Sequence, residues 1–244
     1  MKALRKEKDR NIFLLRKKTE MDIERELSEL KDEEYRSFSG KLVPGKEVLG
    51  VRVPDLRRLA KRIVKEDPES GDRFIRSLPH RYLEENHLHA FILSEEKDMN
   101  ELIRKTEEFL PYVDNWATCD SFTPVVFRKD TSRVPGLIDY WLDSDREYTV
   151  RYGIRLMLSR KDFSKENMEA VIRAGKRNDY YVYMAASWYL SMAALENPED
   201  FKKVFLRDKT GDRLYKETIK KILESRQFTD SEKDFYRNLR KGNG

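Results

Sequence analysis

Four side chains of the types that stabilise a developing cation stand in three apolar, helix-like segments. Asp120 follows Trp116 by four residues, and this spacing places both side chains on the same face of a helix. Arg151 and Trp188 stand in two later segments of the same character. Aromatic faces attract positive charge, and a carboxylate adds Coulomb attraction and can orient or deprotonate a water. The set suits attack of water on an oxocarbenium-like sugar whose leaving group is already good.

The same residues also have purely structural interpretations. Arg151 is poorly suited to stabilising a cation itself, so it would either clamp a phosphate or keep Asp120 ionised. A tryptophan in a helical protein is most often part of the core, as we expect for Trp141, and an aspartate four residues after one can simply cap or pair. The catalytic interpretation therefore requires that separate helices bring the side chains together.

The elements available to position them are helical almost throughout. Apolar residues recur at helical spacing from Val53 to Val64, and similar stripes include Trp116–Phe127, Val150–Leu158 and Tyr181–Leu195. No alternating strand pattern of useful length is present. The clearest irregular connection is Leu42–Val53, which contains a proline and two glycines.

The segments that look most buried recur at a regular interval. They begin near Arg81, Asn115, Arg146 and Tyr180. A thirty-odd-residue period of paired helices is typical of an α-solenoid, in which equivalent helices line one concave wall. We therefore predict an all-α fold of antiparallel helix pairs, forming a curved single domain over residues 31–244 with a concave basic face. A basic, helical N-terminal segment would occupy residues 1–30.

Composition narrows the class of protein further. Only 10 glycines and 8 prolines in 244 residues argue against a strand-and-turn architecture, and no apolar stretch reaches the roughly 18 residues of a membrane span. The single cysteine, Cys119, excludes an internal disulfide and suits the cytoplasm. His87 and His89 face different ways on a helix, so we expect no metal site and no cofactor. We interpret Glu84 and Glu85 as a solvated turn.

The net charge of +5 is concentrated at the N-terminus. Residues 1–20 carry eight Lys or Arg against three Asp or Glu, and the remaining 42 basic and 42 acidic residues cancel. A surface for a polyanion must therefore come from local segregation of charge. Arg160 and Lys161 end the helix that bears Arg151, within reach of a DNA backbone running over it. We predict that both contact DNA, which would make binding strongly salt-dependent.

Four segments resemble, in order and spacing, the motifs of the AlkD-like DNA alkylation repair family. They are Leu49-Gly-Val-Arg-Val-Pro-Asp-Leu-Arg-Arg-Leu59, Val113-Asp-Asn-Trp-Ala-Thr-Cys-Asp120, Tyr148-Thr-Val-Arg-Tyr-Gly-Ile154 and Met184-Ala-Ala-Ser-Trp188. The resemblance spans roughly residues 30–225, and four motifs in register are more specific than any one of them.

The resemblance implies an α-solenoid of HEAT-like helix pairs that acts as a DNA glycosylase. Such an enzyme would excise cationic N3- or N7-alkylated purines from double-stranded DNA, as a monomer and without a base-binding pocket. Carried over by position, Trp116 and Trp188 would contact the deoxyribose, Asp120 would be the catalytic carboxylate, and Arg151 would be the nearby backbone-contacting cation. No general acid is needed, because an alkylated purine already carries the positive charge that makes it depart.

Two other functions remain open from the sequence. The first is a non-catalytic helical-repeat protein that binds branched or distorted DNA, since the family also contains members without glycosylase activity. The second is a scaffold for protein partners whose aromatic residues are core or interface anchors. The presence of all four candidate residues favours the glycosylase. On this interpretation Asp120→Asn loses most activity and little stability.

Overall fold

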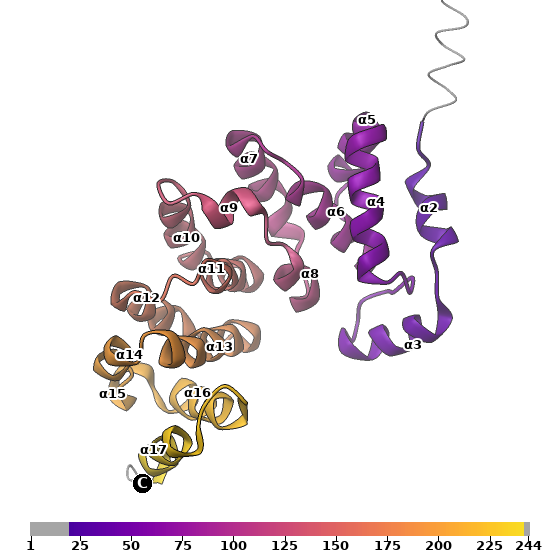
Figure 1. Cartoon of the computed structure of the whole chain (residues 1–244). Helices are drawn as coiled ribbons and strands as arrows, with labels where there is room; N and C mark the ends of the chain where they lie inside the picture. The colour runs from indigo at the N-terminus through magenta and orange to yellow at the C-terminus, as the bar shows by residue number, and fades with distance from the viewer. Residues whose placement is uncertain (1–19, 242–244) are drawn as a thin grey trace, which may run out of the picture. The chain divides into compact units, whose positions relative to one another are not determined.

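The protein is helical in both of its compact units. The computed structural model describes residues 20–241 and divides after Tyr112 into two units (Figure 1). Within these residues there are sixteen α-helices and no strand, apart from one isolated bridge between Glu47 and Tyr82. The predicted all-α fold is therefore confirmed. The predicted division into residues 1–30 and 31–244 stays a prediction, and residues 1–19 lie outside the described part.

The first unit is built around a central pair of helices. Its elements are α2 (Ile23–Glu29), α3 (Glu33–Leu42), α4 (Val53–Glu66), α5 (Pro68–Arg76), α6 (Leu83–Ser94), α7 (Met99–Phe109) and the 3-10 helix η1 (Leu110–Tyr112). Helix α4 packs on α5 and α6, and α6 also packs on α7. The apolar stripe of α4 is buried as its spacing predicts: Leu56, Leu59, Ala60 and Ile63.

A buried carboxylate holds the irregular connection between α3 and α4. Glu84, on α6, is 1% exposed, and its oxygens accept hydrogen bonds from the backbone N–H groups of Leu49 (2.8 Å), Gly50 (2.8 Å) and Val51 (3.3 Å). Gly50 has φ +90°, and a Cβ there would lie 2.4 Å from the carbonyl oxygen of Asp32. The interpretation of Glu84 as part of a solvated turn was therefore wrong. Leu49, Gly50 and Val51 begin the first of the four motifs, so this part of the motif has a structural role in the loop.

The second unit contains the candidate residues. Its helices are α8 (Trp116–Ser121), α9 (Val125–Lys129), α10 (Val134–Leu142), α11 (Glu147–Arg160), α12 (Lys165–Gly175), α13 (Tyr180–Glu196), α14 (Pro198–Val204), α15 (Arg207–Thr210), α16 (Asp212–Glu224) and α17 (Asp230–Lys241). No helix in the described residues combines the length and apolar character that crossing a membrane requires.

These helices stack in two layers. In the first layer α8 contacts α11, α11 contacts α13, and α13 contacts α16; in the second, α12 contacts α10, α14 and α15 (Figure 1). The layers join through the α10–α11, α12–α13 and α15–α16 pairs. At one junction the helices approach closely, because a Cβ on Gly175 would lie 2.7 Å from the Cβ of Ala186. This is the predicted repeat of helix pairs.

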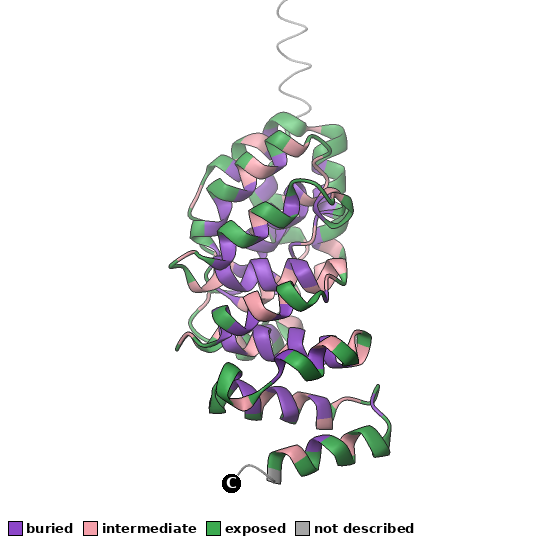
Figure 2. Ribbon diagram, turned by 90° about the vertical axis from the view of Figure 1, so that its left-hand side faces the viewer, coloured by how far each residue is buried: buried purple, intermediate pink, exposed green. Residues whose placement is uncertain are grey.

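Buried residues, purple in Figure 2, recur along the helices of the second unit. The side chains of Trp141, Tyr152 and Phe122 are almost completely buried, and the Tyr152 ring centroid lies 5.1 Å from both of the others. The expectation that Trp141 is a core residue is therefore confirmed. The expected helix Trp116–Phe127 is interrupted, because Pro124 disfavours helical backbone in the residue before it. The chain forms α8 and α9 instead.

Candidate functional site

A short helix with a strong N-terminal cap carries the first two candidate residues. The side chain of Asn115 accepts a hydrogen bond from the backbone N–H of Thr118 at 2.8 Å, which starts α8 at Trp116. Asp120 lies in the last turn of α8, one helical turn after Trp116. Both side chains are partly exposed. Ending α8 before Pro124 leaves the carboxylate at a helix end, where it can meet other helices.

The structure pairs Asp120 with Arg151. Arg151 donates from Nε to Asp120 Oδ1 at 2.9 Å and from Nη2 to Oδ2 at 2.7 Å, a parallel two-point contact. Its Nη1 donates to the backbone oxygen of Tyr181 at 2.7 Å. The Arg151 side chain is 8% exposed and that of Asp120 is 19% exposed. One guanidinium therefore ties α8, α11 and α13 together, while the carboxylate keeps an accessible edge.

Pairing with Asp120 keeps the Arg151 guanidinium positively charged. Burial lowers the pKa of Arg151, but the hydrogen bonds and negative charge of Asp120 outweigh this and raise the pKa above its ordinary value. The guanidinium is thus a permanent counter-ion to Asp120. Of the two roles considered for Arg151, the contact observed is the pairing with Asp120.

The second indole lies beside a second arginine. Trp188 is on α13, two helical turns after Tyr181, and is partly exposed. The Arg155 Cζ atom lies 5.1 Å from the centroid of its ring. The Nε of Arg155 is buried without a hydrogen-bond partner in the described structure.

Arg155 follows Arg151 by one turn of α11, so two arginines of α11 face two aromatic residues of α13. Arg155 was not among the candidate residues of the sequence analysis. Its i+4 spacing from Arg151 was the signal that could have singled it out. The structure thus joins Asp120 directly to Arg151, and it places Trp188 against Arg155.

The two predicted DNA-contacting residues have different surroundings. The Arg160 side chain is 4% exposed; its Nη1 donates to the backbone oxygens of Phe127 (2.7 Å) and Asp130, and its Nε donates to the Asp162 carboxylate. This guanidinium fastens the end of α11 to the end of α9. Lys161 is 73% exposed, and its Nζ lies 3.4 Å from the Glu196 carboxylate. DNA contact by either residue stays a prediction, and only Lys161 offers an exposed cation.

Cys119 lies beside the pair but is unsuited to nucleophilic chemistry. It is 1% exposed, and its Sγ lies 3.6 Å from the backbone oxygen of Tyr148. Burial, reinforced by the negative charge of Asp120, raises the pKa of the thiol far above its ordinary value. Residues 20–241 contain no group of three or more His, Cys, Asp or Glu arranged to hold a metal ion. The groups that the structure brings together here are a carboxylate, two arginines and aromatic rings.

The comparisons with known proteins agree with the motifs. A family model described as DNA alkylation repair enzyme matches residues 23–221, which include every element of this site. A search of curated proteins found no match.

Proposed function

Because the chain belongs to the DNA alkylation repair enzymes, we propose that it is a DNA glycosylase acting on cationic N3- or N7-alkylated purines in duplex DNA, such as 3-methyladenine and 7-methylguanine. The observation that carries the proposal is the Asp120–Arg151 pair. It presents an accessible carboxylate edge one helical turn from a partly exposed indole. A structural ion pair in a helical stack has no need of either feature.

The reaction needs little from the protein. The N-glycosidic bond breaks with its electron pair going to the purine, which neutralises the alkylated ring, and the deoxyribose becomes positively charged. Asp120 would stabilise that charge and orient a water toward C1′. The water forms the new C–O bond, and its proton passes to the carboxylate or to solvent. Arg151 would act as a positioning residue that holds the carboxylate in place through its two hydrogen bonds.

The aromatic residues would supply the rest of the sugar site. Trp116 and Trp188 would pack against the deoxyribose and attract its developing charge, an interaction worth up to about 2 kcal/mol where water is excluded. Arg155 would hold the Trp188 ring through their cation–π contact. As a partly exposed cation it would extend the predicted DNA contact from the end of α11 toward its centre. No cofactor is required, and we expect the monomer to suffice.

One observation favours a second function. Both oxygens of Asp120 already accept hydrogen bonds from Arg151, which lowers their ability to attract another cation. In a protein that binds branched or distorted DNA without cutting it, the pair would only brace α8 against α11.

Incubation of the protein with dimethyl sulfate-treated duplex DNA under single-turnover conditions separates the two functions. We expect release of 7-methylguanine or 3-methyladenine, and a loss of about a hundredfold or more in rate for Asp120→Asn. Asp145→Asn, which changes an exposed carboxylate of the same unit, is the matched control and should keep the wild-type rate.

Thermal unfolding of the same three proteins tests whether the loss is chemical. Asp120→Asn removes the charge facing a buried guanidinium, so we expect it to cost about 1–3 kcal/mol, more than the sequence alone suggested. DNA binding without base release by the wild type would rule out the glycosylase and leave the second function.

A further inference from the structure

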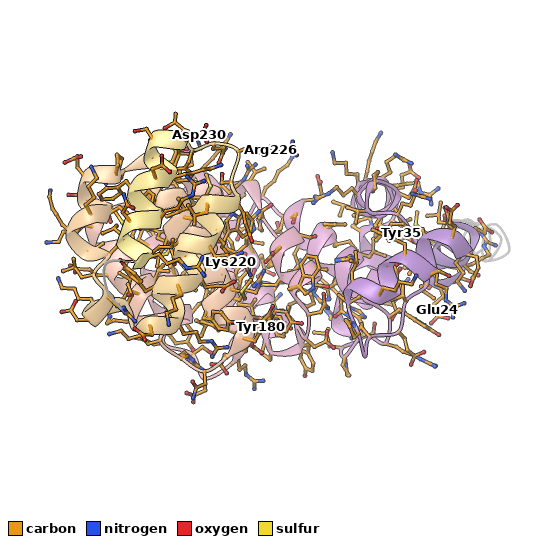
Figure 3. The ribbon with its side chains drawn as sticks, turned by 90° about the horizontal axis from the view of Figure 1, so that it is seen from below. Glu24, Tyr35, Tyr180, Lys220, Arg226 and Asp230 are labelled. Atoms are coloured by element: carbon orange, nitrogen blue, oxygen red, sulfur yellow. The ribbon has the colours of Figure 1, made fainter. Side chains whose placement is uncertain are left out.

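A cavity in the first unit lies between α3 and the connection that follows this helix. Its volume is about 610 Å³, within the usual range for ligand pockets. Helix α3 is a surface helix with one buried residue, Ser39, and Figure 3, which labels its Tyr35, shows side chains projecting from it. We call this hollow the α3 cavity. Its charged lining residues are Lys31, Glu33, Arg36, Lys41, Lys46 and Glu47.

Positive charge predominates in this lining, since four of the six side chains are basic. One of the two carboxylates is paired with a residue outside the lining: Glu47 accepts hydrogen bonds from Arg81 Nε at 2.9 Å and from Arg81 Nη2 at 2.8 Å. Glu33 pairs more loosely, with both of its oxygens 3.3 Å from Arg36 Nη1. The α3 cavity therefore carries an excess of positive charge and suits an anion.

Two of the cations are held in place by backbone carbonyl groups. Arg36 donates from Nε to the backbone oxygen of Val48 at 3.1 Å, and Lys46 donates from Nζ to the backbone oxygen of His80 at 3.4 Å. Groups that are ordered before a ligand arrives lose less conformational entropy on binding it. Lys41 is exposed, so its ammonium can turn toward an anion in the cavity.

A glycine in the last turn of α3 leaves this wall of the cavity open. The backbone of Gly40 is helical, so no left-handed conformation requires a glycine there. A Cβ added to Gly40 would meet no described atom within 4 Å, so close packing does not require one either. Glycine is less favourable than alanine inside a helix. What the missing side chain provides is room for a ligand to approach the backbone of α3.

We propose that the α3 cavity binds a phosphate group. Phosphate oxygens accept charge-assisted hydrogen bonds from guanidinium and ammonium groups, and a planar guanidinium can donate two of them in parallel. Arg36 and Lys46 would hold the phosphate from two sides, and Lys41 would close over it. The phosphate belongs either to a small phosphorylated molecule or to the backbone of a DNA strand. None of the residues involved is part of the Asp120–Arg151 pair, so the site goes beyond the proposed base release.

Isothermal titration calorimetry of the full chain with sodium pyrophosphate tests the site, because this ion carries phosphate groups and nothing else. We expect saturable binding with a dissociation constant below about 1 mM at low salt. The eight Lys or Arg of residues 1–20 also attract anions, but they do so equally in every variant.

Two substitutions at Gly40 separate binding from stability. Gly40→Glu places a negative side chain in the cavity and should weaken pyrophosphate binding by about tenfold or more. Gly40→Ala adds one methyl group and should cause a smaller loss. Thermal unfolding of both variants should occur at the wild-type temperature or above it, since alanine and glutamate favour a helix more than glycine does.

A pair of lysine variants tests whether the position of the charge matters. Lys41→Gln removes an exposed cation of the cavity and should weaken pyrophosphate binding by about threefold. Lys65→Gln is the matched control, because Lys65 is an exposed lysine in the last turn of α4 and does not line the cavity. It should bind as wild type.

The affinity of wild type and Gly40→Glu for paired duplex DNA, measured by fluorescence anisotropy, identifies the source of the phosphate. Weaker DNA binding by Gly40→Glu indicates the backbone of a strand, and equal binding indicates a small phosphorylated molecule.

Three results would overturn the inference. They are an absence of saturable pyrophosphate binding in the wild type, unchanged pyrophosphate binding in Gly40→Glu, and equal losses in Lys41→Gln and Lys65→Gln. Base release is measured separately, so the proposed function and this inference fail independently.

Discussion

Two carboxylates on helices, one in each unit, have their charge satisfied in different ways. Glu84 in the first unit is 1% exposed and receives three backbone N–H groups from one loop. Asp120 in the second unit is 19% exposed and receives the two-point contact of Arg151. Backbone donors leave Glu84 no open edge, whereas the planar arginine occupies one side of Asp120 only. Burial with backbone partners indicates a structural carboxylate, and partial burial with a charged side chain leaves room for chemistry.

The largest effect that tests this comparison is expected from Glu84→Gln. An amide cannot accept all three loop N–H groups, and its own NH₂ group would face them. We expect the free energy of unfolding to fall by about 3 kcal/mol in urea denaturation, with the base-release rate of the folded protein unchanged. Glu66→Gln, on the exposed end of α4, is the control and should change neither quantity. If Glu84→Gln lowered the base-release rate without lowering the free energy of unfolding, Glu84 could not be classed as a structural carboxylate in contrast to Asp120.

A smaller effect is expected on acidification, and it should be confined to the first unit. The rings of His80 and His89 are buried, with His80 Nε2 2.9 Å from His89 Nδ1, and they stack on Phe74 and Phe109 respectively. Burial, with a smaller effect of Lys46, lowers the pKa of His80 to about 4. Burial, with the charges of His80 and Lys105, also lowers the pKa of His89.

The unfolded chain therefore binds protons below pH 6.5, while His80 in the folded first unit resists protonation until about pH 4 and the pKa of His89 is lowered as well. Stability should be complete above pH 6.5 and fall by about 2 kcal/mol by pH 5. Urea unfolding at several pH values measures this, and the double variant His80→Gln/His89→Gln should flatten the profile between pH 6.5 and 5. An equally steep profile in the double variant would assign the acid sensitivity to other groups.

The smallest effect concerns the second arginine of α11. Arg155→Met removes the cation over the Trp188 ring, so we expect about a fivefold loss in base release. If Arg155 contacts a phosphate, the slope of log affinity against log salt should fall by about 1. Lys161→Met is the matched comparison at the exposed end of the same helix. A change of slope in Lys161→Met alone would place the phosphate contact where the sequence first suggested it.

The helices could be predicted because their signal is local. The spacing of Leu56, Leu59 and Ile63 marks the face of α4 that is buried, and in the second unit the thirty-odd-residue period reflects helix pairs that pack on their neighbours. The break between α8 and α9 was missed because an apolar stripe from Trp116 to Phe127 outweighed a single proline.

Polar partners could not be predicted, because they come from distant parts of the chain. Glu84 meets a loop more than thirty residues earlier, and two adjacent glutamates near a helix start look solvated in the sequence. Arg160 similarly bonds carbonyl oxygens at the end of α9, which no side-chain pattern reveals. Asp120 and Arg151 were considered as partners only because a charged side chain on an apolar helix face needs a partner of opposite charge.

The three-way use of Arg151 ties reactivity to architecture. Its Nε and Nη2 donate to α8 and its Nη1 donates to α13, so the same side chain that pairs with Asp120 also joins two helices to α11. Replacing Asp120 leaves the buried Arg151 guanidinium without its carboxylate partner. Replacing Arg151 removes the hydrogen bonds that join both α8 and α13 to α11. Re-engineering this enzyme toward another chemistry would therefore require exchanging both positions as a unit, preferably for an uncharged couple of equal bulk.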